Sequence, residues 1–251
     1  MSNFRLLLPT LAITSAFAYY KAKQDKKACN VAVLASRNGT ALRPAIEAAV
    51  KKQIPVNIGL VISDKQYAPI LRYAKERNIP ALYISPFDQY GQKKTREAYD
   101  AEVAEAIKKH KINVIALAGW MRIFSDEFIP AVGVPIMNVH PSRLPRHAGL
   151  MDEKVHESVL KAGDPISGCT IHLVEPGEVD SGSILIQTEC EVTADETVAS
   201  LKAKVQAQEA EAFLDIFTRL GAENINHLFA RLIKEHKASA NVDSGPSLKP
   251  R

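Results

Sequence analysis

The chain has 251 residues, of which 46% are hydrophobic and 24% charged, so it can bury a sizeable core and is not a disordered or fibrous chain. The formal charge of +4 comes from the first 28 residues, which carry five basic residues and one acidic residue, while the rest of the chain carries 27 of each sign. A body without net charge disfavours polyanion binding through a broad basic surface, so we expect no nucleic-acid partner.

Residues 1–28 differ in composition from the body. An apolar run at 6–20 lies between Arg5 and a basic stretch and is similar to a targeting or anchor-like segment. The run is shorter than the ~20 residues that cross a bilayer as a helix, and Pro9 interrupts it, so membrane contact is not favoured. Three cysteines without a C-x-x-C pair indicate a reducing compartment. We expect a cytoplasmic protein, with organelle import, weak membrane anchoring and a mis-assigned start codon as alternatives.

From residue 30 to residue 140, short apolar runs alternate with longer amphipathic ones. They predict strands at 30–35, 56–62, 81–85, 112–119 and 134–140, and helices at 42–50, 70–77 and 95–109. The alternation is typical of an α/β fold with a Rossmann-like, mostly parallel sheet and helices on both faces. In such a sheet, ligands bind beyond the carboxyl ends of the strands.

The pattern changes after Gly149. A helix is predicted at 153–162, and strand-like runs at 168–175 and 182–192 flank the polar turn P-G-E-V-D-S. These two runs predict an antiparallel C-terminal extension of the sheet. A helix at 197–220 closes a domain that spans residues 29–220. For residues 221–251 we expect a C-terminal helix and a disordered tail, the tail beginning at Ala238.

The loop after the first strand is a candidate phosphate site. Residues 36–42 lead directly into a helix, which places free backbone N–H groups where a phosphate can bind. Gly39 permits a tight turn, and Thr40 can cap the helix or contact a ligand. The loop has neither G-x-G-x-x-G nor the Walker pattern, which disfavours dinucleotides and ordinary nucleoside triphosphates. A plain turn without a ligand is the alternative.

Asn138 and His140 end a predicted strand. Residues two apart in a strand face the same side, so both side chains project together while Val139 points to the opposite layer. Pro141 keeps the backbone of His140 extended. An amide beside an imidazole can polarise a carbonyl and handle a proton. The alternative is that the two side chains satisfy local backbone groups.

Asp180 lies in the turn between the last two predicted strands. A carboxylate near an imidazole raises the pKa of the imidazole and can orient the ring or a water molecule. The sequence does not bring Asp180 near His140, and an Asp beside glycine is often only a turn former.

Other chemistries find little support. His147, His156 and His172 lack metal-ligand spacing, so we expect no metal. No G-x-S-x-G elbow and no cysteine with a partner signature is present, which argues against covalent catalysis. The cluster at 120–124 follows a predicted buried strand and is either core or a wall for a flat aromatic ligand.

Seven motifs occur in a single order along the chain. They are S-R-N-G-T-A-L at 36–42, T-R-E-A-Y-D at 95–100, L-A-G-W-M-R-I-F at 117–124, N-V-H-P-S-R-L-P at 138–145, G-C-T-I-H-L-V at 168–174, E-V-D-S-G at 178–182 and V-Q-x-Q-E at 205–209. Together they resemble the folate-dependent phosphoribosylglycinamide formyltransferase family, over roughly residues 29–220. The 138–145 motif is shared among 10-formyltetrahydrofolate hydrolases and transferases, whereas the first and last motifs favour the member that acts on glycinamide ribonucleotide.

The resemblance implies a role for individual residues. The catalytic trio falls on Asn138, His140 and Asp180. The ribonucleotide site falls on Gly39, Thr40, Ala41, Gln206 and Glu209. The folate contacts fall on Arg96, Met121, Arg122, Ile123, Phe124, Asn138, Pro176, Gly177, Glu178, Val179 and Asp180.

The implied reaction transfers a formyl group from 10-formyltetrahydrofolate, a co-substrate, to the amine of phosphoribosylglycinamide in purine synthesis, in a formyltransferase fold without a metal. A monomer or a homodimer is expected. The chain departs from the family pattern at Arg37, Ala41 and Arg143, where Gly, Asn and Leu are common, and its loops at 149–156 and 175–180 are longer. Ala41 puts one ribonucleotide hydrogen bond in doubt.

Three other readings are weaker. A formyltetrahydrofolate deformylase has a long domain before the catalytic one, and a methionyl-tRNA formyltransferase has a barrel-like domain after it, whereas only 28 residues precede the body here and about 30 follow it. A catalytically silent scaffold on the same fold would not need Asn138, His140 and Asp180 together.

Overall fold

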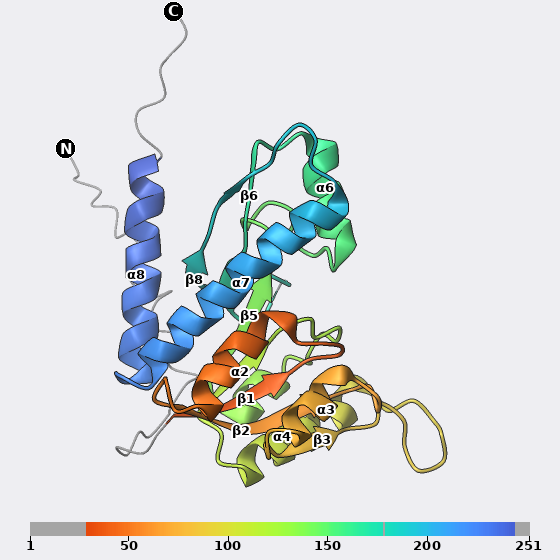
Figure 1. The fold of residues 1–251 in the computed structure, drawn as a ribbon. Helices are drawn as coiled ribbons and strands as arrows, with labels where there is room; N and C mark the ends of the chain where they lie inside the picture. The colour runs from red at the N-terminus through yellow and green to blue at the C-terminus, as the bar shows by residue number, and fades with distance from the viewer. Residues whose placement is uncertain (1–28, 178, 244–251) are drawn as a thin grey trace, which may run out of the picture.

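The computed structural model describes residues 29–177 and 179–243, and its centre is a seven-stranded sheet in the order β3-β2-β1-β4-β5-β7-β8 (Figure 1). The strands are β1 (Cys29–Leu34), β2 (Val56–Ser63), β3 (Ala81–Tyr83), β4 (Val114–Leu117), β5 (Ile136–His140), β7 (Thr170–Leu173) and β8 (Ile184–Gln187). The first five of these run parallel, β7 pairs antiparallel with β5, and β8 pairs antiparallel with β7. The predicted mostly parallel sheet with an antiparallel C-terminal extension is confirmed.

The helices cover both faces of the sheet. They are η1 (Thr40–Leu42), α2 (Arg43–Val50), α3 (Pro69–Lys75), α4 (Arg96–Lys109), α5 (Phe128–Val132), α6 (Glu153–Ala162), α7 (Val198–Leu220) and α8 (Ile225–Asp243). The helix α6 has the bounds that its pattern predicts. The short helix α5 contains Pro130 and has no periodic pattern long enough to predict it.

The central strand β1 shows why the sheet is buried on two sides. Val31 and Val33 pack into one apolar cluster together with residues of α2, α3, α7 and α8. Ala32 and Leu34 face the other cluster, which α4 and α5 complete. All four side chains are fully buried, so the strand is a continuous apolar run rather than an alternating one.

The C-terminal helix belongs to the main core. Its buried residues Leu228, Phe229, Leu232 and Ile233 join the cluster on the α7 side of the sheet, and α8 lies along β8 (Figure 1). The core therefore continues past residue 220, where the predicted domain ends. The helix also runs to Asp243, past Ala238, where the tail is predicted to begin, although the buried side chains that the structure describes in it all lie before residue 234.

A few smaller features differ from the predicted pattern. The apolar run at 182–192 divides into β8 and a short strand β9 (Cys190–Glu191), which pairs with β6 (Ile166–Ser167) in a separate two-stranded sheet.

Within residues 29–177 and 179–243, no helix has the length and apolarity needed to cross a membrane. The segment at 1–28, with its apolar run, lies outside the described residues, as do residues 244–251.

Candidate active site

A cavity of about 480 Å³ opens where the strand order of the sheet reverses. Its walls come from the residues that follow β1, β4 and β5, from the turn between β7 and β8, and from one face of α7. Parallel strands direct the loops after them to the same edge, and a reversal of strand order separates two such loops to leave a crevice. The predicted site at the carboxyl ends of the strands is where this cavity lies.

Most of the predicted site residues line this one cavity. They are Gly39, Thr40, Ala41, Met121, Arg122, Ile123, Phe124, Asn138, His140, Gly177, Val179, Asp180, Gln206 and Glu209. Two do not line it: Arg96 is exposed at the start of α4, and Pro176 is exposed in the turn between β7 and β8. Glu178 lies outside the described residues.

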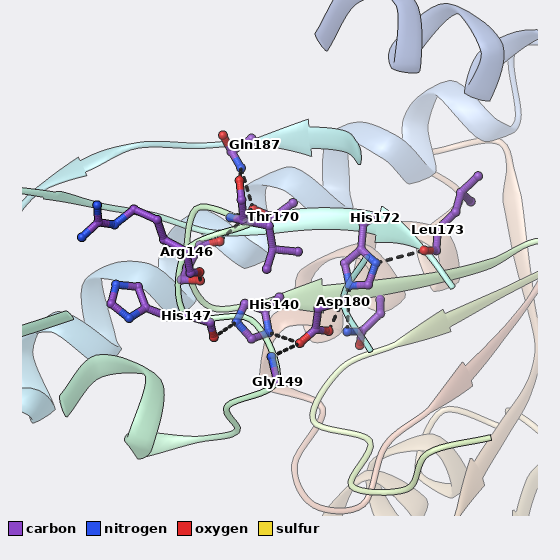
Figure 2. A network of polar contacts seen from close by, with 12 residues as sticks. His140, Arg146, His147, Gly149, Thr170, His172, Leu173, Asp180 and Gln187 are labelled. Carbon is purple, nitrogen blue, oxygen red and sulfur yellow. Dashed lines mark hydrogen bonds and ion pairs between the residues drawn. The ribbon is translucent and has the colours of Figure 1, made fainter. Parts of the chain in front are cut away.

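His140 and Asp180 are in direct contact although 40 positions separate them in the sequence (Figure 2). Nδ1 of His140 lies 3.1 Å from Oδ2 of Asp180, and their side chains are only 4% and 7% exposed. The backbone N–H of Gly149 donates to the same carboxylate oxygen at 2.9 Å. The antiparallel hairpin of β7 and β8 thus brings its turn over the end of β5, where the imidazole is.

Both ring nitrogens of His140 face acceptors. Nε2 lies 3.0 Å from the backbone oxygen of His147, which can only accept a hydrogen bond. Nδ1 faces the carboxylate of Asp180, which accepts when it is ionised. The imidazolium, with a proton on each nitrogen, is therefore the form of His140 that satisfies both contacts.

Asp180 is held as a carboxylate. Burial alone would raise the pKa of the Asp180 carboxyl, but the hydrogen bond from His140, the charge of His140 and the hydrogen bond from the Gly149 amide keep that pKa far below its usual range. Its backbone has a φ of 61°, a left-handed conformation that Asp tolerates better than most residues. The turn can therefore bend sharply enough to aim the carboxylate at the ring.

His172 is a member of the site that the sequence does not reveal. It lies directly opposite Asn138 in the pairing of β5 with β7. Nδ1 of His172 donates to the Leu173 carbonyl oxygen at 3.0 Å, so Nε2 accepts from the amide nitrogen of Asn138 at 3.2 Å. His172 thereby fixes the orientation of the Asn138 amide. The signal that could have found it is the β5–β7 register, which pattern analysis does not supply.

The loop after β1 forms the opposite end of the cavity. Gly39 has a φ of 56°, and a Cβ there would lie 3.0 Å from Ile70 of α3. The helix η1 begins at Thr40, so the backbone N–H groups of Thr40 and Ala41 have no partner within the helix. The loop thus presents two backbone donors to the cavity, and anion binding there stays a prediction.

Three charged residues stand beside this loop. Asp152 pairs with Arg37 at 2.9 Å and with Lys202 of α7 at 2.8 Å, and all three line the cavity. Hydrogen bonding from Lys202 lowers the pKa of the Asp152 carboxyl. One carboxylate therefore holds two cations at the edge of the loop, and neither cation was singled out as a ligand by the sequence.

The α7 wall contains a buried acid. Lys202, Gln206 and Glu209 recur at helical spacing and line the cavity from one face of α7. Burial raises the pKa of Glu209 to about 8. Near neutral pH the Glu209 side chain is therefore largely a neutral acid, which can both donate and accept a hydrogen bond.

The remaining wall is apolar. Trp120 stacks on Phe124, whose ring lies 4.0 Å from that of Phe128, so this aromatic cluster is both core and cavity wall. Ile123 and Val179 are 46% and 43% exposed at the cavity lining. Their position suits the flat, partly apolar body of an aromatic ligand.

Comparison with known proteins identifies the family of this chain. The family model described as formyl transferase matches residues 29–217. The chain belongs to the formyl transferase family. It is 35% identical over 182 residues to the phosphoribosylglycinamide formyltransferase of Escherichia coli, covering 72% of this chain and 81% of that protein.

Two further comparisons agree. The crystal structure of phosphoribosylglycinamide formyltransferase from Bacillus halodurans superposes with a TM-score of 0.70 at 31% identity, over 78% of this chain and 98% of that one. The trifunctional purine biosynthetic protein adenosine-3 of Drosophila melanogaster is 37% identical over 185 residues, which are 73% of this chain but only 13% of that protein. The chain thus matches one part of the larger trifunctional proteins.

Proposed function

We propose that this formyl transferase moves the formyl group of 10-formyltetrahydrofolate to the amine of phosphoribosylglycinamide. The observation that carries the proposal is the contact of His140 with Asp180 at 3.1 Å, next to Asn138 in the cavity. The relatives that share the formyl transferase family model include enzymes named for this substrate, one of which the chain covers over 81% of its length.

The proposed reaction needs no covalent enzyme intermediate. The substrate amine attacks the formyl carbon on N10 of the folate, and the carbonyl oxygen gains negative charge. The His140 imidazolium and the Asn138 amide stabilise that charge. The bond from carbon to N10 then breaks, and a proton lost by the attacking amine passes to N10. The carboxylate of Asp180 lies against Nδ1 of His140 and complements the positive charge of the imidazolium.

The ribonucleotide would bind across the cavity from the loop after β1. Its phosphate would accept from the N–H groups at Thr40 and Ala41, with Gly39 leaving room for close approach. Ala41 offers no side-chain hydrogen bond, so the backbone carries this contact. Gln206 and Glu209 line the same cavity and would hold the glycinamide end.

The folate would occupy the wall formed by residues 121–124 and the β7–β8 turn. Met121 is fixed there because its backbone N–H donates to the Ser36 hydroxyl at 2.9 Å. The guanidinium of Arg122 lies 3.8 Å from the centroid of the Tyr99 ring. These contacts hold a rigid surface against which a flat ring system can stack. We assign folate contacts to this wall, and Arg96 has no place in it.

We also propose that the chain acts in the cytoplasm on small molecules alone, as a monomer or homodimer. Cys29, Cys169 and Cys190 are all free, which suits a reducing compartment. Mass spectrometry of the mature N-terminus from cells would separate this location from import, since an imported protein loses its first residues.

The deciding experiment mixes the purified full chain with both substrates and follows formyl transfer by mass spectrometry. We expect formylated product only when both substrates are present. His140→Ala should lower turnover by about 10²- to 10⁴-fold, whereas His110→Ala, a matched change at the C-terminal cap of α4 and outside the cavity, should leave it unchanged. Release of formate without the amine acceptor would instead identify a hydrolase and overturn the proposal.

A further inference from the structure

A second His–Asp pair lies outside the cavity, behind the segment at 141–149. Nε2 of His147 lies 2.7 Å from Oδ2 of Asp164, a residue that follows α6, and Nε of Arg146 donates to Asp164 at 3.1 Å. Nδ1 of His147 lies 2.9 Å from the hydroxyl of Ser158 on α6. The side chains of His147 and Asp164 are only 10% and 11% exposed. His147 and Asp164 thus form a largely buried, hydrogen-bonded anchor, with Arg146 on its exposed side.

The backbone of the same segment faces the other way, toward the first His–Asp pair (Figure 2). The carbonyl of His147 accepts from Nε2 of His140 at 3.0 Å, and the N–H of Gly149 donates to Asp180 at 2.9 Å. The side chain of His147 is therefore held by Asp164 and Ser158 on one side of the segment, and its backbone carbonyl contacts the imidazole of His140 on the other side.

The backbone conformation of His147 is one that few residues other than glycine adopt. Its φ of 59° lies in the left-handed region. Such a conformation persists where surrounding contacts fix it. The contacts to Asp164 and Ser158 supply that restraint, and the hydroxyl of Ser142 adds a bond to the Arg146 carbonyl at 2.7 Å.

We propose that Asp164 and His147 are positioning residues that act through the backbone of the segment on His140. They hold the His147 carbonyl where it accepts the Nε2 proton of His140, which leaves Nδ1 directed at Asp180. Without this acceptor, His140 loses the partner that fixes its ring and its second proton. The consequence for turnover rests on the proposed function, whereas the effect on the His140 ring does not.

The test uses two variants and one matched control in the full chain. Asp164→Asn removes the charge that His147 and Arg146 share. His147→Asn removes the ring and keeps a residue that tolerates a positive φ, so the backbone can still fold as it does here. The control Glu196→Gln neutralises another carboxylate, 4% exposed and paired with Lys204, that does not line the cavity.

The decisive readout is nuclear magnetic resonance of the imidazole groups in the ligand-free protein. We expect a slowly exchanging ring N–H proton of His140, assigned by its loss in His140→Ala. In Asp164→Asn and His147→Asn that proton should exchange at least about tenfold faster, and in Glu196→Gln it should be unchanged. A merely stabilising ion pair would lower the melting temperature without moving this signal.

Kinetics supply the second readout. In both variants kcat should fall about ten- to a hundredfold while KM for each substrate stays within about twofold, because neither residue touches the cavity. An unchanged His140 signal in both folded variants would overturn the inference, whatever happens to kcat. A changed signal in a protein that transfers no formyl group would sustain the positioning and refute the proposed function instead.

Discussion

Asp180→Asn isolates the charge of the carboxylate from its hydrogen bonds. The new amide oxygen can take the place of Oδ2 and accept from His140 and from the N–H of Gly149, at positions now 3.1 and 2.9 Å away. The new amide nitrogen can take the place of Oδ1, 3.4 Å from Nε2 of His172, which is an acceptor. The geometry survives, and only the negative charge beside the imidazolium is lost.

Two estimates bracket the effect on turnover. A hydrogen bond between charged groups is worth about 1–2 kcal/mol more than a neutral one. Two unit charges 3.1 Å apart attract by about 5 kcal/mol at an effective dielectric constant of about 20. At about 1.4 kcal/mol per tenfold change, the bracket runs from about fivefold to several thousandfold, and we expect kcat to fall about a hundredfold.

The assay compares kcat and melting temperature for the wild type, Asp180→Asn and Asp126→Asn. Asp126 lines the same cavity and is exposed, so its variant repeats the chemical change without the His140 contact. Because the pKa of Asp180 is lowered by folding, its contribution to stability is present above the unfolded pKa and is lost as the pH falls through the folded value. A kcat for Asp180→Asn within threefold of the wild type, at unchanged melting temperature, would refute the role of the charge.

Three further predictions concern other parts of the chain. Phe229→Ala should lower the free energy of unfolding by about 3–5 kcal/mol in urea titrations, because Phe229 is fully buried in α8; a loss below 1 kcal/mol would show that α8 is not part of the core. Asp152→Asn should release Arg37 and Lys202 from their shared carboxylate, so that both cations can attract the phosphate of the ribonucleotide. We expect KM for the ribonucleotide to fall several-fold in steady-state kinetics, and a raised KM would contradict this. Burial raises the pKa of Glu209, so its stabilising contribution is lost as the pH rises toward about 8; Glu209→Gln should therefore raise the melting temperature more at pH 9 than at pH 5, and an equal change at both would count against it.

The parallel half of the fold follows from the sequence because its strands are continuous apolar runs. The run at 56–62 is found as β2 within one residue, and α6 has its predicted bounds. Elements that depend on tertiary contacts are less accessible to pattern analysis. The short helix α5 has no periodicity to detect, and the place of α8 in the main core depends on Leu228, Phe229, Leu232 and Ile233 meeting residues from distant parts of the chain.

In the site, too, local patterns predict some positions, while others depend on tertiary contacts. The positions of Asn138 and His140 on one face of β5 follow from the period of a strand, and both line the cavity. The contact of His140 with Asp180 does not follow from any local pattern, since it depends on how the hairpin folds over β5. The spacing of His172 in the sequence argues only against a metal site, and its place opposite Asn138 is visible only once the strands are paired.

The pairing of β5 with β7 also limits how this protein can be redesigned. His172 and Asn138 meet because they are opposite one another, and a strand that slips by one residue turns every side chain to the other face. An insertion of a single residue into β7 would therefore separate His172 from Asn138, even if Asn138, His140 and Asp180 were all kept. Engineers who want a different acceptor should leave that strand at its natural length.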